Sequence, residues 1–163
     1  MYAVEMRGIT KQFKNVLANS NVDLLVQRGE IHSLLGENGA GKSTLMNILY
    51  GMYAPTSGEI SVQGKPVKIE NPLKAIELGI AMVHQHFMLI EPMTVAENIF
   101  MGRKMGKVYS KRRLNALARE LFAEYGFNMD PSMKVSRLSP ANQQLVEIAR
   151  AISNNAKIMI MDE

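Results

Sequence analysis

The residues with the clearest chemistry form a glycine-rich stretch, GENGAGKST, at residues 36–44, which matches the pattern G-x-x-x-x-G-K-[ST]. Glycines at these spacings let backbone N–H groups turn inward and approach phosphate oxygens without obstruction by side chains. Lys42 adds a mobile positive charge suited to β- and γ-phosphates, and the Ser43 hydroxyl is a hard oxygen ligand of the kind Mg²⁺ prefers. The stretch therefore predicts a cradle for the phosphates of a nucleotide.

The flanking sequence predicts the elements that position this stretch. The apolar run at residues 31–35 favours a buried strand that ends at Gly36, and residues 42–49 favour a helix that stops near Gly51. That helix would point the positive end of its dipole at the phosphates. The pattern alone does not distinguish a kinase, a GTPase, a helicase or a transporter. The candidate nucleotide-binding residues of the stretch are Gly36, Asn38, Gly39, Gly41, Lys42, Ser43 and Thr44.

The rest of the chain predicts a β-rich first part, a mainly helical insert at about residues 91–140, and a final strand. Apolar patterning predicts strands at residues 3–9, 21–26, 80–83 and 158–161, with a turn and a short strand within 55–62. Helices are predicted at residues 72–78 and 94–101, along a stripe at 114–125 that ends at Gly126, and along a stripe at 145–152. Thr94 followed by Glu97 is the pattern of a capping box.

Composition limits the remaining function classes. The chain has 163 residues, of which 47% are hydrophobic and 21% charged, as expected for one globular domain with its own core. No apolar run approaches the roughly 20 residues that span a bilayer, and we expect a cytosolic protein. The absence of cysteine excludes disulfides and thiolate metal sites. The net charge is +4, but its densest run, Lys111-Arg112-Arg113, opens an amphipathic helix, so no nucleic-acid partner is predicted.

Three further motifs indicate which class of nucleotide-binding protein this chain resembles. LSPANQQ at residues 138–144 resembles the ABC signature L-S-G-G-Q, and MVHQHF at 82–87 resembles the Q-loop of that family. IMIMDE at residues 158–163 resembles Walker B with its catalytic glutamate. Over essentially its whole length the chain resembles the ATP-binding subunits of ABC transporters, and most closely those of sugar and nucleoside importers.

The resemblance implies an α/β fold of the P-loop NTPase class. This fold has a RecA-like core with a mixed sheet, an N-terminal antiparallel β part and a helical insert. Residues 1–163 would form one ABC ATPase domain, with a P-loop part at 1–90, a helical subdomain at 91–140, and the signature helix and Walker B strand at 141–163. A D-loop and a switch histidine would follow Glu163, so the chain is interpreted as incomplete at its C-terminal end. We expect the isolated piece to hydrolyse ATP very slowly.

The resemblance also implies roles for single residues. Phe13 would stack on adenine, although a core aromatic is the alternative. Asp162 would hold Mg²⁺ together with Ser43. Gln85 would sense the metal and the γ-phosphate, unless it is an ordinary loop residue. Glu163 would act as the general base, so that Glu163 and Gln85 are the candidate catalytic residues and Ser43, Gln85 and Asp162 the candidate metal ligands.

Ser139 would contact ATP in trans, on the P-loop of a second ATPase domain. Pro140 and Ala141 stand where the family usually has two glycines, and proline removes one backbone donor. Ser139 as N-cap with Pro140 at the first helical position is nevertheless a favourable helix start. We expect a weakened trans contact, or else a composite site that is degenerate.

The implied cofactors are ATP and Mg²⁺. The implied partners are a second ATPase domain in a head-to-tail dimer, transmembrane permease subunits, and indirectly a solute-binding protein. The chain itself would lie at the cytoplasmic face of the membrane.

Most of the thirteen methionines are expected to pack in the core, while Met88, Met93 and Met101 are candidates for a hydrophobic docking surface. The alternatives are a soluble ABC ATPase that works on ribosomes or DNA, and a nucleotide-binding fragment without catalysis.

Overall fold

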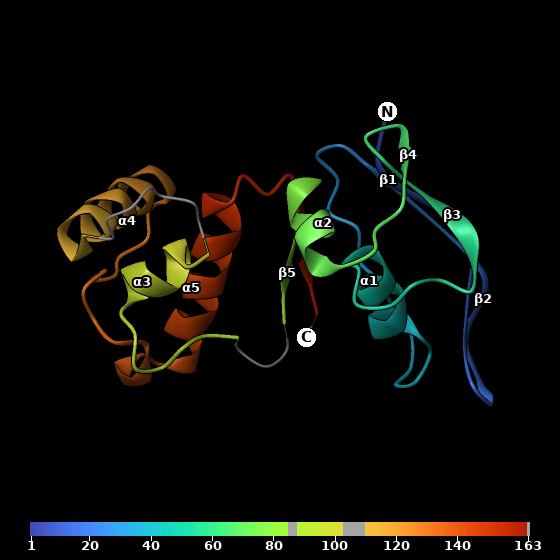
Figure 1. Ribbon diagram of the computed structural model, residues 1–163, viewed down its shortest axis with the longest axis horizontal. Helices are drawn as coiled ribbons and strands as arrows, with labels where there is room; N and C mark the ends of the chain where they lie inside the picture. The colour runs from blue at the N-terminus through green and yellow to red at the C-terminus, as the bar shows by residue number, and fades with distance from the viewer. Residues whose placement is uncertain (85–87, 103–109, 163) are drawn as a thin grey trace. The chain divides into compact units, whose positions relative to one another are not determined.

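The computed structural model describes residues 1–84, 88–102 and 110–162. They form two compact units, Met1–Ala81 and Met82–Glu163 (Figure 1). The division predicted from the sequence, at residues 90 and 140, remains a prediction.

The first unit contains an antiparallel sheet. Its strands are β1 (Tyr2–Phe13), β2 (Val16–Gln27), β3 (Ser57–Val62) and β4 (Lys65–Val67), in the order β2-β1-β3-β4 (Figure 1). The antiparallel N-terminal part is therefore confirmed. β1 and β2 are longer than predicted because they form one hairpin in which Phe13 pairs with Val16. β4 was not predicted from the sequence.

Two helices complete the first unit, and both were predicted. In α1 (Lys42–Leu49), the buried side chains Leu45, Ile48 and Leu49 lie on one face. α2 (Pro72–Glu77) begins with proline at its first position, and the Asn71 side chain accepts a hydrogen bond from the Lys74 N–H at 2.9 Å. The buried apolar residues of this unit include Val4, Met6, Ile9, Leu24, Leu45, Ile48, Leu49, Ile60, Val62, Ile69 and Ala75.

The second unit is mainly helical. Its helices are α3 (Val95–Phe100), α4 (Lys111–Tyr125) and α5 (Pro140–Ser153), with a 3₁₀ turn, η1 (Val135–Arg137), before α5. α3 contacts both α4 and α5. The core between them is formed by Val95, Ala96, Ile99, Phe100, Leu114, Ala118, Phe122, Val135, Leu138, Val146 and Ala149. Within the described residues, no helix is long and apolar enough to cross a membrane.

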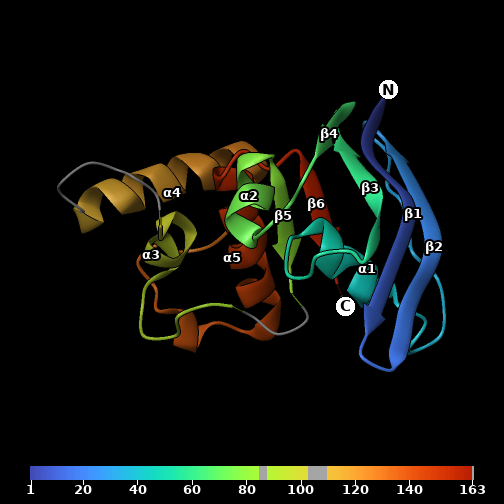
Figure 2. The same ribbon diagram turned by 45° about the vertical axis from the view of Figure 1, so that its right-hand side comes forward.

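The strand predicted at residues 31–35 is wrong in this structure. These residues have no strand assignment, and Ile31 and Leu35 are 97% and 92% exposed. An apolar run favours a strand only where neighbouring backbone can pair with it. In the described part of the chain, β1 to β4 pair among themselves, and β5 (Ile80–Val83) pairs with β6 (Ile158–Met161) (Figure 2). Residues 31–35 therefore have the composition of a strand but no described strand beside them.

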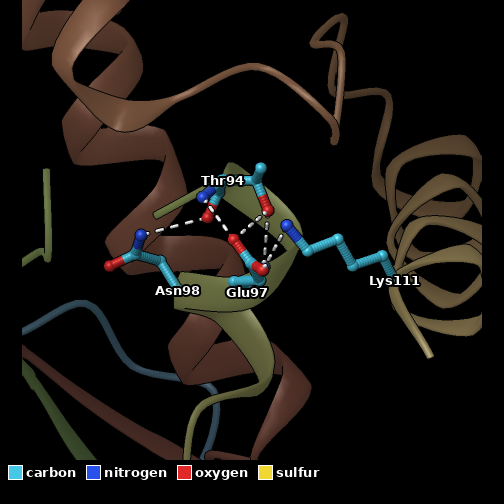
Figure 3. Close-up of polar contacts among 4 residues, drawn as sticks. All are labelled: Thr94, Glu97, Asn98 and Lys111. Atoms are coloured by element: carbon cyan, nitrogen blue, oxygen red, sulfur yellow. Dashed lines mark hydrogen bonds and ion pairs between the residues drawn. The ribbon is translucent and has the colours of Figure 1, made fainter. Parts of the chain in front are cut away.

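A capping box begins α3, as the sequence predicted (Figure 3). The Thr94 N–H donates to the Glu97 carboxylate at 2.8 Å, and the Glu97 N–H donates to the Thr94 hydroxyl at 3.3 Å. The Lys111 ammonium lies 3.5 Å from the same carboxylate. The Thr94 backbone N–H, with smaller contributions from the Thr94 hydroxyl and Lys111, holds the pKa of Glu97 below its ordinary value of 4.5, against partial burial, which raises it.

This lowered pKa predicts a pH-dependent effect of Glu97→Gln. Glu97 is stabilised in its charged form, so its contribution is fully present above pH 4.5 and is lost as the pH falls through the lowered pKa. We expect Glu97→Gln to reduce the free energy of unfolding by about 0.5 kcal/mol at pH 7. Urea denaturation at a series of pH values should show this difference shrinking below pH 4. A difference that stays constant down to pH 3 would contradict the assignment.

Candidate nucleotide-binding site

The predicted phosphate cradle is an exposed turn in the first unit. Residues 36–40 are all solvent-exposed, and the Ala40 N–H donates to the Glu37 carbonyl at 3.1 Å. Gly39 and Gly41 have φ angles of +85° and +88°, a conformation that side-chain-bearing residues rarely adopt. The loop therefore presents its backbone to solvent, with two glycines in a conformation that other residues rarely adopt.

Lys42 is held by the loop that precedes it. Its ammonium donates to the Gly36 carbonyl at 2.7 Å and to the Glu37 carbonyl at 2.9 Å. These acceptors are neutral dipoles, and a phosphate oxygen would give the same ammonium a stronger, charge-assisted hydrogen bond. The two carbonyls thus hold the Lys42 ammonium against the loop.

The start of α1 has the polarity that an anion site needs. Its N-cap is Gly41, which has no side chain to accept from the first-turn amides, and the first turn contains no acidic residue. Helical hydrogen bonding begins with the Leu45 N–H donating to the Gly41 carbonyl at 2.9 Å. The first turn therefore has no carboxylate of its own that would offset the positive end of the helix dipole. Ser43 and Thr44 lie in this first turn.

β2 positions Gly41 by direct contact. The Asn19 side-chain amide donates to the Gly41 carbonyl at 3.1 Å, and a Cβ added to Gly41 would lie 2.3 Å from the Ala18 carbonyl oxygen. Only glycine fits here, for reasons of both φ and space. Asn19 was not among the residues predicted from the sequence. It is a polar residue within a strand, and the structure shows that its side chain is buried, where a polar group needs a hydrogen-bond partner.

Phe13 lies at the tip of the same hairpin. Its ring makes an edge contact with Tyr53, with centroids 5.2 Å apart, and the Lys11 ammonium lies 4.9 Å from the Phe13 centroid. Lys11 is fixed there because it also donates to the Ala54 carbonyl at 2.7 Å. Phe13 is 37% exposed and so lies at the surface rather than in the core. Tyr53, a second exposed aromatic beside it, was not predicted.

The candidate metal and catalytic residues near the chain's end belong to the second unit. The Asp162 N–H donates to the Val83 carbonyl at 3.1 Å, which places Asp162 beside the end of β5. Gln85 follows Val83 by two residues in the sequence. Gln85 and Glu163 themselves lie outside the described residues. The structure thus brings Asp162 next to the chain that leads to Gln85.

The start of α5 confirms the helix start predicted at Ser139. The exposed Ser139 is the N-cap, its hydroxyl accepts from the Asn142 N–H at 3.4 Å, and Pro140 occupies the first helical position. The Gln143 side-chain amide donates to the Val135 and Leu138 carbonyls, both at 3.4 Å, and so holds the turn before the cap. No acidic residue lies in the first turn of α5. This helix start also suits an anion, with one donor fewer because of the proline.

Comparisons with known proteins agree with this geometry. The family model described as "ABC transporter" matches residues 19–163. The chain is 47% identical over 165 residues to the guanosine import ATP-binding protein NupO of Bacillus subtilis (strain 168), an alignment that covers 99% of this chain and 32% of that protein. It is 48% identical over 166 residues to the xylose import ATP-binding protein XylG of Geobacillus kaustophilus (strain HTA426), with 99% and 33% covered. The chain spans about a third of the length of these relatives.

Among solved structures, the chain is similar to the ATP-binding cassette MJ0796 in a dimeric, post-hydrolysis state bound to ADP and Pi. The two share 30% sequence identity and a TM-score of 0.79, over 98% of this chain and 73% of that one. The fold is therefore that of an ABC ATPase cassette, a P-loop NTPase fold, as predicted. With the glycine loop, the signature-like helix start and the Walker B-like strand in place, this chain belongs to the ABC transporter family as one of its ATP-binding cassettes.

Proposed function

We propose that this chain binds and hydrolyses ATP to power import of a sugar or a nucleoside across the membrane. The observation that carries the proposal is the exposed glycine loop, whose Lys42 ammonium rests on the loop carbonyls beside the uncapped start of α1. The names of the curated relatives support the class of transported solute, since one specifies guanosine import and the other xylose import.

ATP would bind with its phosphates on the loop and on the first turn of α1. Lys42 would exchange the Gly36 and Glu37 carbonyls for phosphate oxygens, and Phe13 would contact the adenine. The donors proposed for Mg²⁺ are the Ser43 hydroxyl, the Gln85 amide and the Asp162 carboxylate. This oxygen donor set fits Mg²⁺, which typically binds one or two carboxylates and substrate phosphates rather than an all-protein cage. Bound Mg²⁺ would neutralise charge that develops on the phosphates.

Hydrolysis would depend on residues from two ATPase domains, this one and a second in a head-to-tail dimer. Glu163 would orient and deprotonate the attacking water, and Gln85 would respond to the γ-phosphate. Ser139 at the start of α5 would contact ATP held by the partner cassette, in keeping with the dimeric state of the similar structure. Pro140 leaves this helix start with fewer backbone donors, so the contact in trans is weaker than one made by a glycine pair.

The permease would dock on an apolar patch of the second unit. Met88, Ile90, Met93 and Met133 are 64%, 42%, 37% and 38% exposed, and the Val95 N–H bond to the Met133 carbonyl joins the two segments that contain them. Met101, also considered from the sequence, is only partly exposed. A solute-binding protein would act through the permease, and the cassette would lie at the cytoplasmic face of the membrane.

Gly41→Ala tests the phosphate cradle. A methyl group at this φ would collide with the Ala18 carbonyl, so the loop and α1 would have to separate from β2. We expect nucleotide affinity, measured by titration calorimetry with Mg-ATP, to fall at least about tenfold. Gly29→Ala is the matched control, because Gly29 also has positive φ but nothing lies within 4 Å of the added carbon. Equal affinities for the two variants would contradict the cradle.

Import by the assembled transporter tests the whole proposal. We expect Lys42→Ala to abolish both nucleotide binding and solute uptake in proteoliposomes.

Glu163→Gln should keep ATP binding while slowing hydrolysis about a hundredfold or more, because only the general base is lost. Rapid hydrolysis by Glu163→Gln would overturn the catalytic role of Glu163. Purification with ribosomes or DNA, in place of a permease, would favour a soluble ABC ATPase.

The docking patch has a test of its own. The double variant Met88→Ser, Met93→Ser should reduce assembly with the permease, measured by co-purification from membranes, while nucleotide affinity stays unchanged. Met52→Ser is the control, since Met52 is a 52% exposed methionine of the first unit. Assembly as complete as in the control would show that the permease binds elsewhere.

A further inference from the structure

A single positive charge contacts both rings of the aromatic pair at the tip of the β1–β2 hairpin. Lys11 and Phe13 are two residues apart in β1, so their side chains leave the same face of the strand. The Lys11 ammonium lies 4.9 Å from the Phe13 ring centroid and 5.9 Å from the Tyr53 ring centroid, both within the range of cation–π attraction. The two rings meet edge to face, at an interplanar angle of 83°.

The hydrogen-bond acceptor of the Lys11 ammonium belongs to a loop that α1 holds in place. The ammonium donates to the Ala54 carbonyl at 2.7 Å. This loop continues from the end of α1, where the Met52 N–H donates to the Asn47 carbonyl at 2.8 Å. A Cβ added to Gly51 would lie 2.7 Å from backbone atoms of the residue before α2, so the loop also packs closely against that chain. The Ala54 carbonyl is therefore a fixed point to which the hairpin is attached.

Two hydrogen bonds to Thr56 join β1 to the same loop on either side of Lys11. The Thr56 N–H donates to the Thr10 carbonyl at 2.8 Å, and the Thr56 hydroxyl accepts from the Gln12 N–H at 3.1 Å. Phe13 comes next in the strand and is 37% exposed, so packing does not enclose its ring. The ring is therefore located by side-chain contacts, among them the ammonium and the second ring beside it.

An exposed aromatic ring binds a flat ligand better when its orientation is already restrained. A free phenyl ring turns about two side-chain torsions, and a base that stacks on the ring has to stop this motion. Contacts that hold the ring in advance leave less ordering to be done when the ligand binds. The Lys11 ammonium provides such a restraint, because its bond to the Ala54 carbonyl limits its own movement.

We propose that Lys11 is a positioning residue of the base site, which holds the Phe13 ring against the loop after α1 so that its exposed surface receives the base of a nucleotide. This inference rests on the proposed function, in which Phe13 contacts the adenine. Lys11 acts through the ring and makes no contact of its own with the phosphates. Because α1 begins at the glycine loop and ends at the loop that contains Tyr53, the bond from Lys11 to Ala54 attaches the base site to the helix that serves the phosphates.

The first test compares a nucleotide with its phosphates alone, by titration calorimetry on the intact protein. Lys11→Met keeps a long flexible side chain but loses the charge and the donor, and it should weaken Mg-ATP binding about threefold to fivefold. Binding of magnesium tripolyphosphate, which has no base, should not change. Lys11→Arg keeps the charge and a donor for the Ala54 carbonyl, and it should recover most of the affinity for ATP. Equal losses for ATP and tripolyphosphate would overturn the positioning role.

Lys14→Met is the matched control. Lys14 follows Phe13 at the tip of the same hairpin, so this variant removes one positive charge from the same place. In the described part of the chain, the ammonium that lies over the two rings is that of Lys11. The affinity of Lys14→Met for Mg-ATP should therefore stay within about twofold of that of the unmodified protein. A loss as large as that of Lys11→Met would show that charge alone is responsible.

The second test asks whether Lys11 acts through the Phe13 ring. In a Phe13→Ala background, Lys11→Met should cause no further loss of ATP affinity, because there is no ring left to hold. In ATP hydrolysis by the assembled transporter, Lys11→Met should raise KM for ATP and leave kcat unchanged, since the chemistry takes place at the phosphates. Additive losses of affinity, or a lower kcat at unchanged KM, would contradict this inference.

These measurements separate failure of this inference from failure of the proposed function. Mg-ATP affinity that does not depend on Lys42 would overturn the proposed function, and with it any role of Lys11 in nucleotide binding. Affinity that depends on Lys42 and on Phe13, but not on Lys11, would overturn this inference alone.

Discussion

The close approach of β2 to Gly41 is the constraint on which the proposed phosphate cradle depends. The Asn19 amide bonds to the Gly41 carbonyl, and the Ala18 carbonyl leaves no space for a Cβ. One contact therefore fixes where the loop ends and where α1 begins, and with them the direction of the helix dipole. The hairpin that makes this contact also ends in Phe13, so the same two strands position the candidate phosphate and base sites.

The sequence predicted local features well and long-range pairing poorly. Thr94 with Glu97, Ser139 with Pro140, and Gly126 after α4 are short-range signals whose partners lie within a few residues, and each marks the helix end it predicted. Residues 31–35 have a strand composition, but their state depends on neighbours that no local pattern specifies. Asn19 and Lys11 were missed for the same reason, since their partners are 22 and 43 residues away.

The second unit uses buried polar side chains where a simpler core would use apolar ones. Asn98 and Glu147 each hold backbone groups of a segment with no regular structure, at Ile90 and Met88. Burying them is costly, but it gives that segment defined hydrogen-bond partners, which apolar packing cannot provide. The exposed methionines on the same segment can then vary in contact without altering its path.

The bonds of Lys42 to the Gly36 and Glu37 carbonyls have a consequence for the end of a catalytic cycle. In the proposed function, these oxygens would compete with the phosphates of a nucleotide for the Lys42 ammonium. Entry of a nucleotide would have to break two short hydrogen bonds, which would lower its net affinity, and departure of the product would re-form them. The lysine would then have acceptors in both states, so its charge would not have to be rehydrated as the spent nucleotide leaves. The same two carbonyls would therefore weaken nucleotide binding and favour release of the product.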